Sequence, residues 1–134
     1  MRYSYSLIHG LFSDESKFIL DQVNFSNIKT NSKALLYFTH NNIILNNITA
    51  ENITCYGDND NSSFILFDSG EIKKSIYIRN FQAKKCISNG PFIKVRGALN
   101  KFRLTKSSIN AVKSYGPIIE NLSEKVKIFL LLSF

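Results

Sequence analysis

The chain has 134 residues, of which 44% are hydrophobic, and a formal net charge of +7. This length suits one domain, and the hydrophobic content excludes a disordered chain as the default interpretation. Residues 1–72 carry four basic and eight acidic side chains, a net −4, whereas residues 73–134 carry 13 basic and two acidic ones, a net +11. The second half therefore predicts an anionic partner, unless a longer parent protein balances the charge elsewhere. Nucleic acid is not the expected partner, because the basic residues are spread without a known reading motif.

Short apolar strands are expected at regular intervals along the chain. Five of them end at Ile8, Leu36, Ile65, Ile93 and Ile119, so the steps between them are 28, 29, 28 and 26 residues. Each is followed by a second apolar strand, at residues 18–20, 43–45, 76–78, 102–104 and 128–130. A repeat of this length built from strands predicts a solenoid in which each coil packs against its neighbours.

A polar residue interrupts the alternation of apolar and polar residues in the second strands. These residues are Gln22, Asn47, Asn80 and Lys106. The interruption shifts the phase of the alternation, as a bend would, and Asn tolerates the left-handed backbone that a bend requires. A third short apolar contact follows at Ile28, Ile53, Cys86 and Val112. The sequence therefore predicts a three-sided coil with a bend at each interruption.

Stacked coils would align equivalent residues in inward columns. We expect one column at the ends of the short strands and one at the third contact. A further column is expected at Leu20, Leu45, Ile78, Leu104 and Leu130, and the last coil aligns Ser133 with Ser107.

The residues that precede the first column are expected to point outward. They would form an apolar stripe of Leu7, Leu35, Phe64, Phe92 and Ile118. Lys94 and Arg96 follow Phe92, and aromatic rings beside cations suit acidic sugars. Phe64, Phe92, Lys94 and Arg96 are therefore the predicted binding residues. Two alternatives stay open, namely that another segment of the parent protein covers the stripe, or that the two faces are inverted.

Two segments carry a resemblance to a known group of proteins. Residues 76–83 and 88–93 resemble right-handed parallel β-helix repeats. They are similar to the pectin-lyase-like superfamily and to the Asn-rich repeats of polymorphic outer-membrane and adhesin-like proteins, although Gly-Pro or Ser-Ser replaces the Gly-Gly pair of those repeats. The resemblance implies an all-β, right-handed, single-stranded parallel β-helix of about four to five coils of 26–29 residues. Residues 1–134 would form one such domain, truncated at both ends because the last coil has no cap.

The superfamily's enzymes are polysaccharide lyases and hydrolases. Glycoside hydrolysis requires paired carboxylates, but the expected column of Asp21 contains Asn46, Arg79 and Thr105 and no second carboxylate. Lyases of the superfamily use calcium-binding acids with an Arg base, and acids are missing near Arg79. Arg79 and Asp21 are thus only the best candidates for a catalytic remnant, and no cofactor is expected.

Neither a disulfide nor a metal site is predicted. Cys55 and Cys86 lie on adjacent coils but are offset by two positions, which separates them by roughly 8 Å against a limit of about 7 Å. We therefore expect reduced thiols. His9 and His40 have no Cys, His or carboxylate at ligand spacing.

Five Asn-x-Ser/Thr sequons are candidate glycosylation sites in a secreted protein. They begin at Asn24, Asn47, Asn52, Asn61 and Asn121. An Asn-rich chain also produces sequons by chance, and Asn47 is required for a bend.

Three functions are compatible with the sequence. The first is a non-catalytic structural or binding module of an extracellular or cell-surface protein, for adhesion or for binding an acidic polysaccharide or surface glycan. The second is the remnant of a polysaccharide lyase or glycoside hydrolase. The third is end-to-end self-association of acidic first coils with basic last coils, because unpaired strand edges bind other chains. No membrane span is expected, because the apolar residues 126–134 are too few.

Overall fold

A computed structural model describes the backbone of residues 2–3, 5–11, 17–58, 61–123 and 125–133. Side chains are described for residues 5–9, 17–58 and 61–123. Every regular element in this part of the chain is a strand, so it contains no helix that could span a bilayer. The strands are β1 (Arg2–Tyr3), β2 (Ile8–Leu11), β3 (Lys17–Thr30), β4 (Ala34–Thr39), β5 (Asn42–Cys55), β6 (Ser63–Asp68), β7 (Lys74–Ser88), β8 (Ile93–Arg96), β9 (Leu99–Ser114), β10 (Ile119–Asn121) and β11 (Lys125–Ser133).

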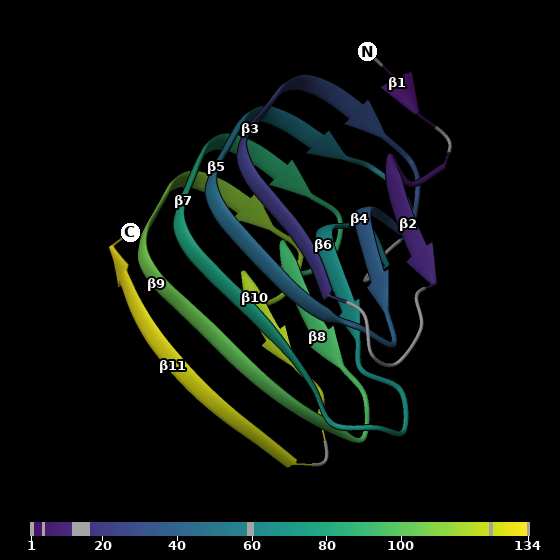
Figure 1. Ribbon diagram of the computed structural model, residues 1–134. Coiled ribbons are helices and arrows are strands. Elements are labelled where there is room, and N and C mark those ends of the chain that lie inside the picture. The colour runs from purple at the N-terminus through teal and green to yellow at the C-terminus, as the bar shows by residue number, and fades with distance from the viewer. Residues whose placement is uncertain (1, 4, 12–16, 59–60, 124, 134) are drawn as a thin grey trace.

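The strands form two parallel sheets that face each other (Figure 1). The long strands make a six-stranded sheet in the order β1-β3-β5-β7-β9-β11, and the short strands make a five-stranded sheet in the order β10-β8-β6-β4-β2. The chain alternates between the sheets, and each crossing adds a strand beside the previous one. The result is a β-solenoid of about four turns, as the repeat predicted.

The predicted columns of equivalent residues are confirmed by the register of the strands. All five residues at the ends of the predicted short strands pair successively, from Ile8 to Ile119. The second column pairs in the same way, from Leu20 to Leu130. In the third column Ile28 pairs with Ile53, and Cys86 pairs with Val112. The alignment of Ser133 with Ser107 was wrong by one residue, because the register shifts after Leu130 and Leu132 pairs with Ser107.

Each long strand turns at two left-handed residues without losing its place in the sheet. At the first bend the φ angles are 51° to 57°, and the residues are the four predicted ones, Gln22, Asn47, Asn80 and Lys106. The second bend was not predicted, and it has φ angles of 50° to 56° at Asn27, Asn52, Lys85 and Ala111. Because pairing resumes after each bend, the third apolar contact belongs to the same long strand as the second column.

The space between the two sheets is filled by apolar side chains, with a group of phenylalanines at its centre. The rings of Phe64 and Phe92 are stacked, with centroids 5.2 Å apart and planes 12° apart. Phe25 meets Phe64 edge-on at 5.6 Å, and Phe81 lies 6.0 Å from Phe64. Aromatic pairs of this kind add stability beyond the area that they bury.

The predicted outward apolar stripe is wrong. Phe64, Phe92 and Leu35 are fully buried, whereas Leu7 is 41% exposed. Each of these three buried residues lies in the same core cluster as the residue that follows it, and at Phe64 the alternation is broken, since the carbonyl oxygen of Phe92 accepts hydrogen bonds from the amides of both Phe64 and Ile65. Two successive side chains therefore face the interior, and Phe64 and Phe92 cannot contact a ligand.

Phe64→Ala should reduce the free energy of unfolding by about 3–5 kcal/mol, because it removes a fully buried ring from the centre of the core. The matched control is Leu7→Ala, at the equivalent position of the first coil, which should cost less than about 1 kcal/mol because this side chain is partly exposed. Urea denaturation measures both. Equal, small effects would contradict the burial of Phe64.

Candidate functional site

Lys94 and Arg96, the two predicted binding cations, are paired within the five-stranded sheet. Lys94 Nζ lies 3.9 Å from a carboxylate oxygen of Glu120. Arg96 donates to the Asp68 carboxylate through Nε at 2.9 Å and to the Tyr37 hydroxyl through Nη2 at 3.3 Å. The Arg96 side chain thereby links β8 to β6 and β4. These contacts stabilise the stacking of coils and reduce the charge that either cation offers to a ligand.

The outer face of the six-stranded sheet carries a second set of cations, at β7 and β9. Side chains alternate across a strand, so the inward residues of these strands leave their neighbours outside. The register places Ser75 beside Lys101, Tyr77 beside Arg103, and Arg79 beside Thr105. Lys106 follows at the first bend. We call the group of Tyr77, Arg79, Lys101, Arg103 and Lys106 the basic face.

Tyr77 lies among the cations of the basic face. Lys101 Nζ is 5.8 Å from the centroid of its ring, and the Arg103 guanidinium carbon is 5.3 Å from it. Partial burial raises the pKa of the Tyr77 phenol. The hydrogen bond and charge of Lys101, with smaller contributions from Ser75 and Arg103, outweigh that effect and lower the pKa below its ordinary value. The phenol therefore lies in a positive electrostatic field.

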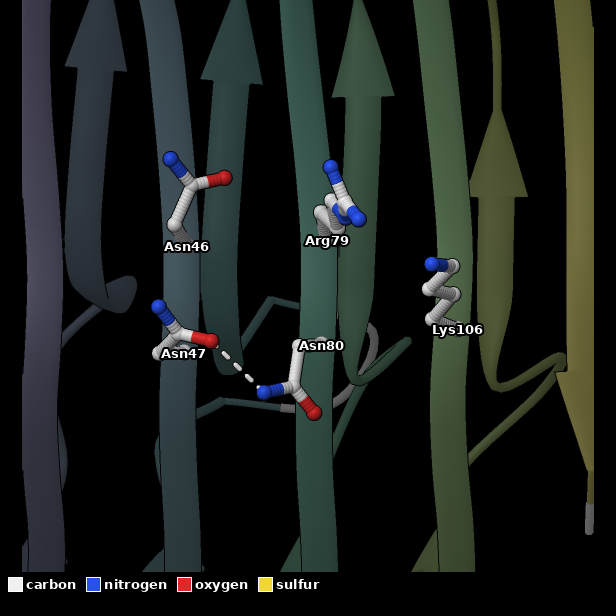
Figure 2. A pocket seen from close by; sticks show the side chains of 5 residues that line it. All are labelled: Asn46, Asn47, Arg79, Asn80 and Lys106. Carbon is white, nitrogen blue, oxygen red and sulfur yellow. Dashed lines mark hydrogen bonds between the residues drawn. The ribbon is translucent and has the colours of Figure 1, made fainter.

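A shallow depression of about 450 Å³ lies at the first bend. Figure 2 shows the five side chains that line it, Asn46 and Asn47 from β5, Arg79 and Asn80 from β7, and Lys106 from β9. Arg79 and Lys106 are exposed. Neither takes part in the ion pairs found between described side chains. The depression thus presents two cations among neutral amides.

Asp21 and Arg79, the candidates for a catalytic remnant, are not brought together. Both lie in one row of the sheet, but Asn46 separates them, so their backbones are roughly 10 Å apart. The Asp21 carboxylate instead accepts a hydrogen bond from Asn47 Nδ2 at 2.8 Å. Asp21 therefore stabilises the bend, and no second carboxylate stands beside it in its row.

Most of the sequon asparagines are engaged with neighbouring coils. Asn47 donates to Asp21 and accepts from Asn80, and Asn52 donates to Asn27. Asn24 accepts from the Thr49 hydroxyl, Asn121 donates to Asn100 at 3.4 Å, and Asn61 is exposed in the loop before β6. Glycosylation at Asn24, Asn47, Asn52, Asn61 and Asn121 stays a prediction.

No metal-binding group or disulfide is seen in the described part of the chain. No three His, Cys, Asp or Glu side chains gather there as metal ligands. Cys55 pairs with Ser88 and is thus offset by two positions from Cys86, as the sequence predicted. Both cysteines are free and buried. Burial, together with the nearby Cys86, raises the pKa of Cys55 to about 12, and burial also raises the pKa of Cys86.

The buried thiols predict a loss of stability at alkaline pH. Because the folded-state pKa values are raised, the contribution of the thiols is fully present below their ordinary pKa of 9.0. It should decline as the pH rises from 9.0 towards the folded-state value of about 12 for Cys55, because only unfolded thiols ionise there. Urea denaturation at pH 8 and pH 10 measures the loss, and a Cys55→Ala, Cys86→Ala double variant supplies the control. An equal pH dependence of the two proteins would contradict the prediction.

No protein-family model, curated protein or solved structure matches the chain. The basic face was missed in the sequence because its residues occupy the variable positions between the apolar ones. The signal was present in residues 76–79 and 101–104, where apolar residues alternate with Tyr77, Arg79, Lys101 and Arg103. The outward positions of the strongly basic half, taken as a separate set, predict the basic face.

Proposed function

We propose that the chain is a non-catalytic module of a pectin-lyase-like protein of the cell surface or extracellular space, and that its basic face binds an acidic polysaccharide. The observation that carries this proposal is the pair of cations, Lys101 and Arg103, within 6 Å of the Tyr77 ring on the outside of a rigid sheet. The membership in the superfamily is supported by the strand repeat and by the β-solenoid fold.

The chemistry of an acidic sugar matches the basic face. A sugar ring has apolar C–H faces that pack on an aromatic ring, and its carboxylate or sulfate groups pair with Lys and Arg. Tyr77 also continues a row of apolar residues, because it pairs with Ile44, which pairs with Ile19. Ile19 is 57% exposed, so this apolar row is open to a ligand along the solenoid axis.

The sheet also reduces the cost of binding. Parallel strands lie about 4.8 Å apart, and backbone pairing fixes the spacing of side chains on successive coils. A ligand that spans several coils therefore meets groups whose backbones need no further ordering, which lowers the entropy cost of association.

The row of Asp21, which contains no second carboxylate, supports a binding role over a catalytic one. Glycosidic cleavage with retention or inversion uses two carboxyl groups within about 10 Å of each other. The row of Asp21 supplies one carboxylate, and that carboxylate is bonded to Asn47.

The binding proposal is tested by calorimetric titration with polygalacturonate, with dextran as a neutral control. The wild-type chain should bind polygalacturonate and not dextran, and affinity should fall as salt is raised because the charges are screened. Tyr77→Ala and the Lys101→Ala, Arg103→Ala double variant should each weaken binding by about tenfold or more.

Lys94→Ala is the matched control, because this lysine lies on the opposite sheet and is paired with Glu120. It should change affinity less than about twofold. Loss of binding in Lys94→Ala with full binding in the Tyr77 and Lys101 variants would place the ligand on the other sheet and overturn the proposal.

A further inference from the structure

The hydrogen bonds at the first bend run in one direction. Asn80 Nδ2 donates to Asn47 Oδ1 at 2.6 Å, and Asn47 Nδ2 donates to Asp21 at 2.8 Å. A carboxylate oxygen has no hydrogen to donate, so Asp21 fixes the orientation of both amides. As a result the carbonyl oxygen of Asn80 lies on the side of β9, as Figure 2 shows. A further amide at the next position of β9 could donate to it and extend this row of hydrogen-bonded side chains, which we call the ladder.

Lys106 occupies that next position instead. Its φ angle is 51°, in the left-handed region where Asn is tolerated far better than Lys. The equivalent residues of the previous coils are Gln22, Asn47 and Asn80. The lysine thus ends the ladder and places a charge where the two previous coils carry an amide.

The position of Lys106 places its charge at the edge of the depression. Its ammonium group lies on the side of its strand that faces β7, and Arg79 stands on the same outer face (Figure 2). Between them is the depression of about 450 Å³, a volume in the range of small-ligand sites. An Arg supplies a flat pair of donors for an oxyanion, and a Lys supplies a compact charge.

We propose that this depression binds one carboxylate or sulfate group of the acidic polysaccharide through Arg79 and Lys106. We call this anion-binding site the seat. This inference rests on the proposed function and assigns separate roles to two parts of the basic face. Tyr77 with Lys101 and Arg103 receives the sugar ring, and the depression fixes one anionic group beside it. Lys106 replaces the ladder amide because it binds the ligand.

The decisive variant is Lys106→Asn, because it restores the ladder residue while it removes the charge. The melting temperature should stay equal or rise, and affinity for a uronate oligosaccharide should fall about tenfold. Arg79→Gln should weaken binding similarly, and Lys106→Arg should retain it. A sulfated oligosaccharide of equal length, titrated in parallel, distinguishes carboxylate from sulfate as the anionic group.

Lys85→Asn is the matched control. Lys85 occupies the second bend with a φ angle of 55°, so this substitution makes the same change of charge and side chain at the same kind of backbone position. It lies outside the depression, and affinity should change less than about twofold. Equal losses of affinity in Lys85→Asn and Lys106→Asn, or no loss in Lys106→Asn, would overturn the seat. The proposal that the basic face binds the polysaccharide would still stand.

The seat can also be tested if no oligosaccharide binds, an outcome that would overturn the proposed function. Inorganic sulfate and acetate are then titrated while NMR follows the side-chain signals of Arg79, Asn80 and Lys106. The seat predicts saturable shifts of these signals, and in Lys106→Asn the shifts of Arg79 and Asn80 should be absent. Shifts that do not saturate, or that persist in Lys106→Asn, would contradict it.

Discussion

The structure depends on one constraint, the in-register stacking of parallel strands. Backbone hydrogen bonds hold Leu45 beside Ile78 and Ile78 beside Leu104, and the same pairing extends to both ends of the column. Each coil has too little interior to bury its own apolar face, so stability comes from the contact of neighbouring coils. The columns of the core and the rows of the outer surface are therefore two results of the same register.

The outer rows differ in what they do. The row of Asp21 and the two bends hold successive coils together through side-chain hydrogen bonds, and Arg96 does the same on the opposite sheet. In the basic half the row of Asp21 carries Arg79 and the first bend carries Lys106, and both side chains line a depression. Positions that serve stability in the first coils serve binding, in our proposal, in the later ones.

The sequence predicted the columns and the first bend because their signals are local and repeated, an apolar period and a polar residue at a fixed place in each coil. It did not predict the second bend, although Asn stands there too in two of the four coils. The burial of Phe64 was missed because it follows from one carbonyl that accepts two amides, a backbone event with no side-chain pattern. The pairing of Arg96 with Asp68 was not predicted, although the 28-residue step from Ile65 to Ile93 also places these two residues side by side.

The most direct test of the register is disulfide formation on the basic face itself. In a Tyr77→Cys, Arg103→Cys double variant the new cysteines would be lateral neighbours on adjacent strands. Their backbones would be about 4.8 Å apart, within the range of a disulfide. A Tyr77→Cys, Thr105→Cys variant offsets them by two positions, to roughly 8 Å. We expect mild oxidation to crosslink the first pair and not the second, as read by the mass of a linked proteolytic peptide. Crosslinking of the offset pair in preference to the aligned pair would contradict the stacking on which the whole account depends.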